Sequence, residues 1–149
     1  MKKIFLICFI LLFICGCGSS VRNVGNTNQF ENSVIKNELI VEDNMHNYTA
    51  NYIKEAILGT KDDITIEMVV YDNLDNATQV QNSQIDTFMK MKSTGSAIKK
   101  EKGNNYYKFT MVSNGYYLVS SRIENTLIFT QTLLKNKDKV DSILNEMGY

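Results

Sequence analysis

The dipeptide Asn114-Gly115 limits the folds open to this chain more than any other feature, because it lies between two runs of alternating apolar and polar residues. Asn and Gly readily adopt the positive φ angles that a two-residue hairpin turn requires. The sequence therefore predicts antiparallel strands over 105–113 and 116–123. Glu124-Asn125 is a weaker signal of the same kind and predicts a further strand over 126–133.

Other strands and helices are predicted on both sides of this meander. Residues 64–71 alternate and are rich in β-branched side chains, which indicates a strand, and 97–102 predicts another. Apolar residues recur at helical spacing in three segments, which predicts helices over 44–58, 77–92 and 137–147.

These elements together predict an α+β protein. The expected architecture is a single small domain over 44–149, an antiparallel β-meander of four to five strands with two to three helices packed on one face. Residues 33–43 fit either a short helix or an added strand. The polar segment 18–32 is rich in Gly, Ser and Asn and predicts a flexible tether.

Two-residue turns also fix which side chains share a face of the meander. One face carries Tyr107, Phe109 and Met111 with their cross-strand neighbours and is the predicted core. The opposite face mixes Tyr, Val, Ile, Thr and Lys, and such a surface is a candidate interaction face. Its candidate residues are Tyr106, Lys108, Tyr117, Val119, Ile123 and Ile128. Alternatively, the segment from Ser33 or the helix over 44–58 covers part of this face.

Residues typical of catalytic or metal sites are scarce. His46 is the only histidine and lies at the start of a predicted helix, where an exposed or capping role is favoured. Asp72 and Asp75 fit N-capping of the next helix better than a calcium loop, because Leu74 stands at the third loop position. We therefore expect no catalytic residue, no metal and no cofactor. Carboxylates from distant positions can still meet in a fold, so a small envelope hydrolase remains the alternative.

The overall charge excludes one class of partner. The chain has 16 Lys and Arg residues against 16 Asp and Glu residues, and the two signs are mixed along the sequence. This balance offers no basic surface, and we expect no nucleic-acid binding.

The first seventeen residues have the three parts of an export signal. Two lysines follow Met1, residues 4–14 form an unbroken apolar run, and small residues come next. Eleven helical residues span only about 16 Å, which is roughly half the hydrocarbon thickness of a bilayer. The segment is therefore predicted to be removed rather than to remain as a membrane span.

Ile14-Cys15-Gly16-Cys17 resembles the lipobox of bacterial lipoprotein precursors, although Leu is commoner at the first position and Ala or Ser at the second. The resemblance implies a diacylglyceryl group on the thiol of Cys17 and cleavage between Gly16 and Cys17. Residues 1–16 would then be the signal peptide, and 17–43 the lipidated cysteine and tether. The implied location is the extracytoplasmic face of the cell membrane.

All three cysteines lie in this leader, at positions 8, 15 and 17, so the mature chain would keep only Cys17. The lipid anchor, the compact domain and the scarcity of catalytic residues together predict a lipid-anchored binding or interaction domain at the bacterial envelope. The membrane is its partner through the lipid, and an envelope protein is a candidate second partner. The oligomeric state is left open by the sequence.

Overall fold

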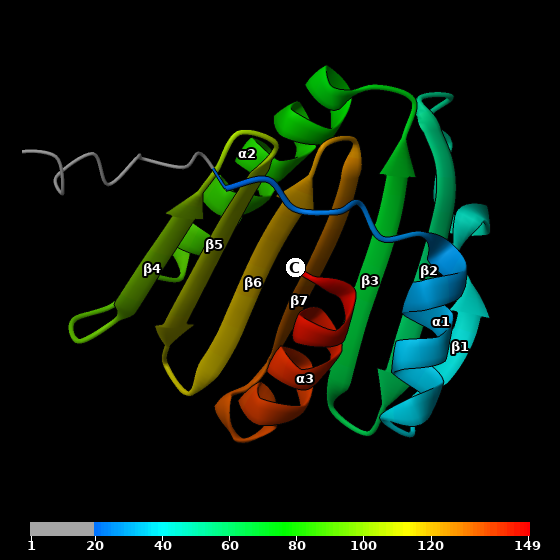
Figure 1. The fold of residues 1–149 in the computed structure, drawn as a ribbon. Coiled ribbons are helices and arrows are strands. Elements are labelled where there is room, and N and C mark those ends of the chain that lie inside the picture. Colours follow the sequence, from blue (N-terminus) through cyan, green and yellow to red (C-terminus); the bar gives the residue numbers. More distant parts are fainter. Residues whose placement is uncertain (1–19) are drawn as a thin grey trace, which may run out of the picture.

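A seven-stranded antiparallel sheet forms the centre of the protein in a computed structural model, which describes residues 20–149 (Figure 1). The strands are β1 (Ile40–Asp43), β2 (Ile53–Lys61), β3 (Ile64–Tyr71), β4 (Ala97–Lys102), β5 (Tyr106–Ser113), β6 (Tyr116–Ile123) and β7 (Thr126–Leu133). Their spatial order is β1-β2-β3-β7-β6-β5-β4. The helices are α1 (Thr27–Lys36), α2 (Leu74–Lys90) and α3 (Lys137–Met147), with 3-10 turns at Met45–Asn47 and Leu134–Asn136. The α+β class is confirmed, with more strands than the four to five expected.

The meander of β5, β6 and β7 has the predicted register. Asn114 and Gly115 have φ angles of 52° and 78°, as a two-residue hairpin turn of this type requires. Met111 lies opposite Leu118, and Lys108 lies opposite Ser121. Because the side-chain period of a strand is two, this register assigns every side chain of the three strands to one of the two predicted faces.

The predicted helix over 44–58 is wrong, because this segment begins with a 3-10 turn at Met45–Asn47 and continues from Ile53 as β2. The pairing of β2 with β3 shifts between Ile53 and Glu55, so Lys54 is an extra residue in the strand. This β-bulge places Ile53 and Ala56, three residues apart, in the same buried cluster. A spacing of three is typical of a helix, and here the bulge produces it in a strand.

The predicted tether over 17–43 is also wrong for its described part, because α1 and β1 belong to the folded domain. The Asn26 side chain accepts a hydrogen bond from the Gln29 amide at 2.9 Å, and the Gln29 side chain accepts one from the Asn26 amide at 3.0 Å. This capping box begins α1. Phe30 and Val34 are then fully buried. The polar composition of this segment suggested a flexible tether, but a short helix needs only one apolar stripe to pack on a sheet.

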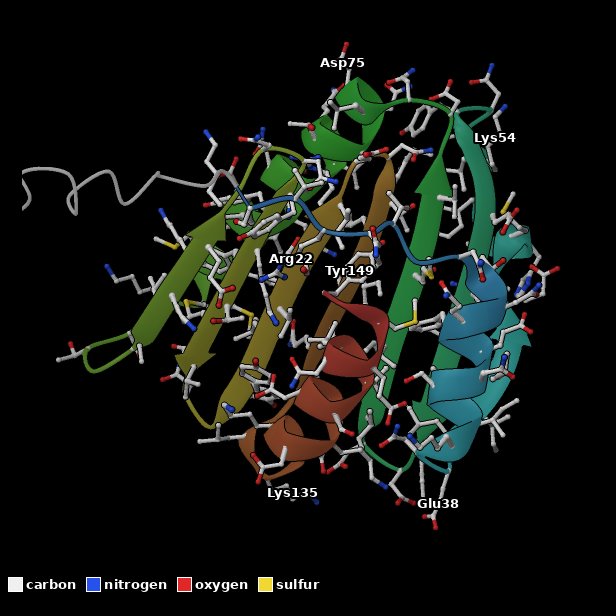
Figure 2. All side chains as sticks on the ribbon, viewed as in Figure 1. Arg22, Glu38, Lys54, Asp75, Lys135 and Tyr149 are labelled. Carbon is white, nitrogen blue, oxygen red and sulfur yellow. The ribbon has the colours of Figure 1, made fainter. Side chains whose placement is uncertain are left out.

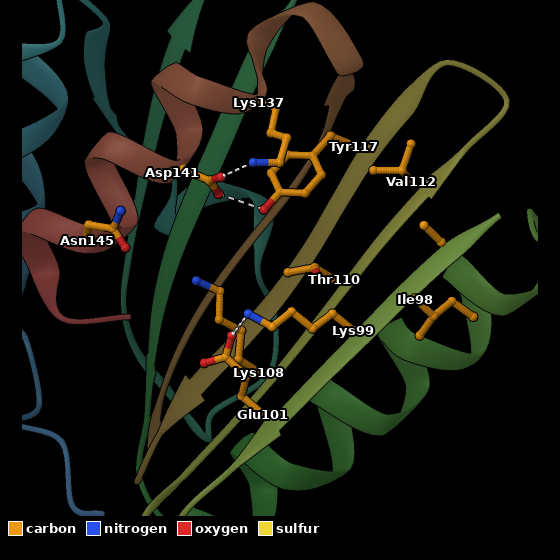
Figure 3. Close-up of a pocket in the computed structure, with 11 residues that line it drawn as sticks. Ile98, Lys99, Glu101, Lys108, Thr110, Val112, Tyr117, Lys137, Asp141 and Asn145 are labelled. Atoms are coloured by element: carbon orange, nitrogen blue, oxygen red, sulfur yellow. Dashed lines mark hydrogen bonds and ion pairs between the residues drawn. The ribbon is translucent and has the colours of Figure 1, made fainter.

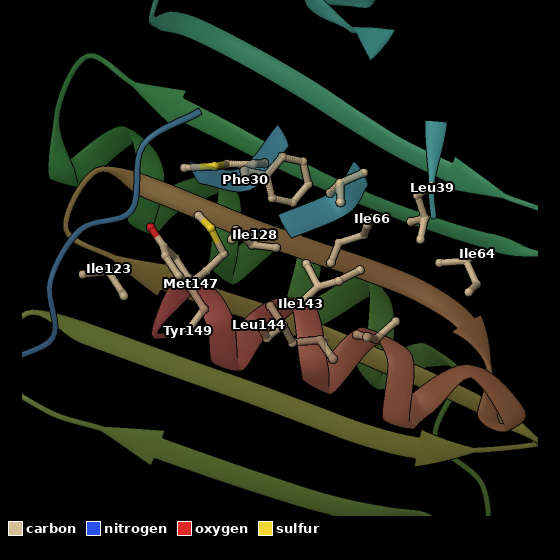
Figure 4. Packing of buried hydrophobic residues seen from close by; sticks show 14 of the residues in the cluster. Phe30, Leu39, Ile64, Ile66, Ile123, Ile128, Ile143, Leu144, Met147 and Tyr149 are labelled. Atoms are coloured by element: carbon tan, nitrogen blue, oxygen red, sulfur yellow. The ribbon is translucent and has the colours of Figure 1, made fainter. Parts of the chain in front are cut away.

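Helices cover both faces of the sheet rather than one. In Figure 1, α1 and α3 lie in front of the strands and α2 lies behind them. Phe88 of α2 packs with Phe109 and Met111 on one face. The larger cluster lies on the opposite face, where Ile143 of α3 and Phe30 of α1 contact the sheet (Figure 4). A seven-stranded sheet presents apolar side chains on two faces, and both have to be shielded from water.

Within residues 20–149, no helix combines the length and the apolar composition needed to cross a membrane.

Candidate functional site

The predicted interaction face is mostly buried beneath α1 and α3. Val119, Ile123 and Ile128 are fully buried, and Tyr106 and Tyr117 are at most 9% exposed. They belong to the largest hydrophobic cluster (Figure 4). The alternative is therefore confirmed, since the helix that contains Ser33 covers part of this face and α3 covers more. These residues cannot form an exposed docking surface.

A cleft remains where α3 leaves the side of this face formed by β4 and β5 uncovered (Figure 3). Its volume is about 400 Å³. Strands β4, β5 and β6 form its floor and one wall, and α3 forms the other wall. Polar and charged side chains dominate its lining, among them Lys99, Glu101, Lys108, Thr110, Tyr117, Lys137, Asp141 and Asn145.

The wall formed by α3 is organised around the carboxylate of Asp141. The Tyr117 hydroxyl donates a hydrogen bond to it at 2.6 Å, and the Lys137 ammonium, one helical turn earlier, donates another. Burial, together with the hydrogen bond to Asp141, raises the pKa of Tyr117 well above its usual range. Tyr117 is therefore a neutral hydrogen-bond donor at the base of this wall (Figure 3).

On the opposite wall, the carboxylate of Glu101 is held between two cations. Lys99 lies 2.8 Å from one of its oxygens, and Arg22 lies 2.9 Å from the other. The hydrogen bond from Lys99 is the main reason why the pKa of Glu101 lies below its usual value. Glu101 is therefore ionised at neutral pH and is poorly suited to act as a general acid.

Lys108 stands between the two walls and is half-buried. Its ammonium donates a hydrogen bond to the main-chain oxygen of Tyr149 at 3.0 Å. Burial lowers the pKa of Lys108, against the opposing effects of Glu101 and Asp141. An ammonium has three donors, and Tyr149 is the only hydrogen-bond acceptor that residues 20–149 provide for Lys108.

Lysines therefore outnumber carboxylates among the side chains that line the cleft. Three lysines line it, whereas its two carboxylates already form ion pairs with Lys99, Arg22 and Lys137. A buried charge is costly unless it is paired. A carboxylate or phosphate group that entered the cleft could accept the free donors of Lys108.

Sequence reasoning identified two of these residues, Lys108 and Tyr117, and missed the others. Lys99 and Glu101 could have been found, because β4 pairs with β5 so that Glu101 lies opposite Lys108 on the same face. Asp141 and Lys137 carried the weaker signal of opposite charges four residues apart.

The remaining candidates lie elsewhere. His46 is exposed in a 3-10 turn, and Asn73, between Asp72 and Leu74, caps α2. Gly16 and Cys17, like the whole predicted signal peptide, lie outside the described residues. Within residues 20–149, His, Asp and Glu side chains do not gather in groups of three or more that could hold a metal ion.

A second pocket of about 320 Å³ lies between α2 and the sheet and is lined in part by the buried residue Glu67. One oxygen of Glu67 accepts hydrogen bonds from the Asn44 amide group at 2.6 Å and from the Tyr48 hydroxyl at 2.7 Å. These bonds attach the segment 44–48 to β3, which gives Glu67 a structural role.

Comparisons with known proteins give no relative from which a function could be transferred: no family model, no curated protein and no solved structure matches the chain.

Proposed function

We propose that this chain is a bacterial lipoprotein, anchored through Cys17 at the extracytoplasmic face of the membrane, whose domain binds an anionic group in the cleft around Lys108. The group would be a carboxylate or phosphate of a small ligand or of an envelope protein. The half-buried ammonium of Lys108, with one acceptor from the described part of the chain, is the observation that carries this proposal.

The anchor rests on the leader of the sequence. A basic start, an apolar run too short to span a bilayer and the lipobox-like Ile14-Cys15-Gly16-Cys17 occur there in the required order. Two acyl chains give stable anchoring where a single chain is marginal.

A small hydrolase is the second candidate, because Glu101 and Asp141 line the same cleft. Hydrolysis of a glycosidic bond by two carboxylates requires one of them to be protonated as the acid. The lowered pKa of Glu101 disfavours its protonated form. The carboxylate of Asp141 already accepts hydrogen bonds from Tyr117 and Lys137 and is not free to face a substrate. We therefore propose binding in preference to catalysis.

The anchor is tested with Cys17→Ala. The wild-type protein should be labelled by a fatty-acid analogue and should sediment with membranes. Cys17→Ala should be unlabelled and should leave the membrane fraction. A wild-type protein that is never labelled would contradict lipidation.

The cleft is tested by nuclear magnetic resonance titration of the lipid-free domain with inorganic phosphate and with acetate. We expect the amide shifts that change to cluster at Thr110, Tyr117 and Asn145. Lys108→Met, which removes the charge and keeps much of the side-chain volume, should abolish them. The matched control Lys54→Met, on the exposed bulge of β2, should keep them. Shifts that persist in Lys108→Met would contradict the proposal.

A further inference from the structure

The chain is fixed to the domain from Ser20 onward, at the loop between β4 and β5. The Asn104 amide donates a hydrogen bond to the Ser20 carbonyl oxygen at 3.2 Å. The Ser20 and Tyr106 hydroxyls lie 2.9 Å apart. In Figure 1 this segment (blue) crosses in front of the sheet before it reaches α1.

Arg22 is held even more firmly, by both its main chain and its side chain. Its amide donates to the Asn105 side-chain oxygen at 2.9 Å, and its carbonyl oxygen accepts from the Asn105 side-chain nitrogen at 2.7 Å. Its guanidinium lies 4.0 Å from the centre of the Tyr106 ring and pairs with Glu101. The segment 20–22 is therefore part of the folded domain.

This attachment leaves very little chain between the domain and the lipid. Cys17 precedes Ser20 by three residues, and a chain of that length reaches at most about 11 Å. The polar headgroup layer of one leaflet is itself roughly 5–8 Å thick. A flexible tether of the length expected from the sequence, about 26 residues, would have a root-mean-square span of roughly 30 Å.

We propose that the end of the domain at which Ser20 is attached rests directly on the lipid surface; this inference depends on the proposed lipidation of Cys17. The loops 103–105 and 124–125 and the start of α2 surround one shallow depression at this end. Their common position follows from the topology, since the Glu124 amide bonds to the Asn105 carbonyl and the Tyr71 amide to the Asn125 carbonyl.

The chemistry of this end fits a lipid surface without electrostatic attraction. Val21 is 67% exposed, and Leu74, at the first position of α2, is 48% exposed. Apolar side chains of this kind are stable at the boundary between headgroups and acyl chains. The exposed acids Asp72, Asp75 and Glu124 offset the cations Arg22, Lys102 and Arg122 at this end, so anionic lipid offers little added attraction.

The test uses single cysteines for fluorescent labelling, because the thiol of Cys17 is blocked by its lipid in the mature protein. Asn104→Cys lies at the proposed membrane end of β4 and β5. Thr94→Cys lies in another exposed loop beyond the other end of β4, about 20 Å away for a strand of six residues. The labelled full-length lipoproteins are placed in vesicles that contain phospholipid with a nitroxide on its headgroup.

We expect several-fold greater quenching at Asn104→Cys than at Thr94→Cys, in zwitterionic and in anionic vesicles alike. A twelve-residue Gly-Ser insertion between Gly18 and Ser19 should remove most of this difference, because the domain could then move away from the lipid. Equal quenching at the two positions without the insertion would overturn the proposal. A difference that survives the insertion would overturn the role of the short tether.

An error in the proposed lipidation and an error in the proposed orientation would give different results. Fatty-acid labelling of each variant is measured first. An unlabelled protein shows that the proposed lipidation is wrong. A labelled protein with equal quenching at both positions shows that only the orientation is wrong.

Discussion

At the floor of the cleft, Lys108 carries a positive charge in a place where burial disfavours it. Its pKa in the folded state therefore lies below that of an unfolded lysine, which is about 10.4. Between these two pKa values the unfolded chain binds more protons than the folded one. The contribution of Lys108 to the free energy of unfolding is consequently lowest at neutral pH, and it rises as the pH increases through that interval.

Lys108→Met should remove this pH-dependent contribution. We expect the free energy of unfolding of the variant, relative to wild type, to be most favourable near neutral pH and to decline as the pH approaches 10. Urea denaturation of both proteins at several alkaline pH values measures this. The ionisation of tyrosines affects both proteins and cancels in the difference. A difference in unfolding free energy that does not change with pH would contradict the lowered pKa of the half-buried Lys108.

Among the elements, α1 depends on a glycine in the strand beneath it. A Cβ atom added at Gly59 of β2 would lie 2.7 Å from a Val34 methyl of α1 and 3.2 Å from a methyl of Ile66. Glycine normally weakens a strand. Here its missing side chain allows the helix to lie close to the sheet.

Gly59→Ala should therefore lower the free energy of unfolding by about 1–3 kcal/mol, as overpacked cores do. Val34→Ala, which removes the nearest methyl groups, should also destabilise by leaving a cavity. The double variant should lose less stability than the sum of the two single variants, because the methyl group added on the strand could occupy part of that cavity. Thermal or urea denaturation of the three proteins measures this coupling, and strict additivity would contradict direct packing.

The helices and strands with regular periodicity could be predicted from the sequence. Strands β3 and β5 to β7 and helices α2 and α3 have regular periodicity and clear turn or capping signals, and their predicted bounds differ from the observed ones by at most a few residues. Strand β2 was mistaken for a helix because its bulge imitates helical spacing. Helix α1 was missed because its capping box lies in a segment of polar composition.

For the whole molecule, the N-terminal segment completes the hydrophobic core. Phe30, Val34 and Leu39 are at most 5% exposed and pack with α3. Ser33 donates a hydrogen bond to Glu146 of α3 at 2.9 Å, and Lys36 forms an ion pair with the same carboxylate. Figure 2 shows Glu38, just after α1, and Lys135, just before α3, at the same end of the molecule.

A chain shortened to residues 44–149 should therefore lose its cooperative folding. Removing three large buried side chains costs about 6 kcal/mol at roughly 2 kcal/mol each. Small domains have a total stability of only about 5–15 kcal/mol. Circular dichroism during heating should show a sharp transition for residues 20–149 and a weak or absent one for 44–149. Equal melting temperatures would show that the domain does begin at 44.

The sequence predicted which side chains share a face of the sheet, but it did not show which helices cover that face. The hairpin register assigned Val119, Ile128 and their neighbours to one face, as observed. Their burial depends on α1 and α3, which come from the two ends of the described chain. Periodicity describes only local structure, so it could not show that both helices pack on this face or that α3 leaves the cleft open.

The spatial order of the strands leaves β1 and β4 as the two edges of the sheet. Unpaired main-chain groups on an edge strand can pair with another chain and begin aggregation. Strand β4 carries lysines at 99, 100 and 102, whose like charges repel the same edge of a second copy. Strand β1 has only four residues, two of them acidic, and offers a short template. Both edges therefore discourage the growth of one sheet across many copies, and the protein should resist fibril formation even when it is crowded.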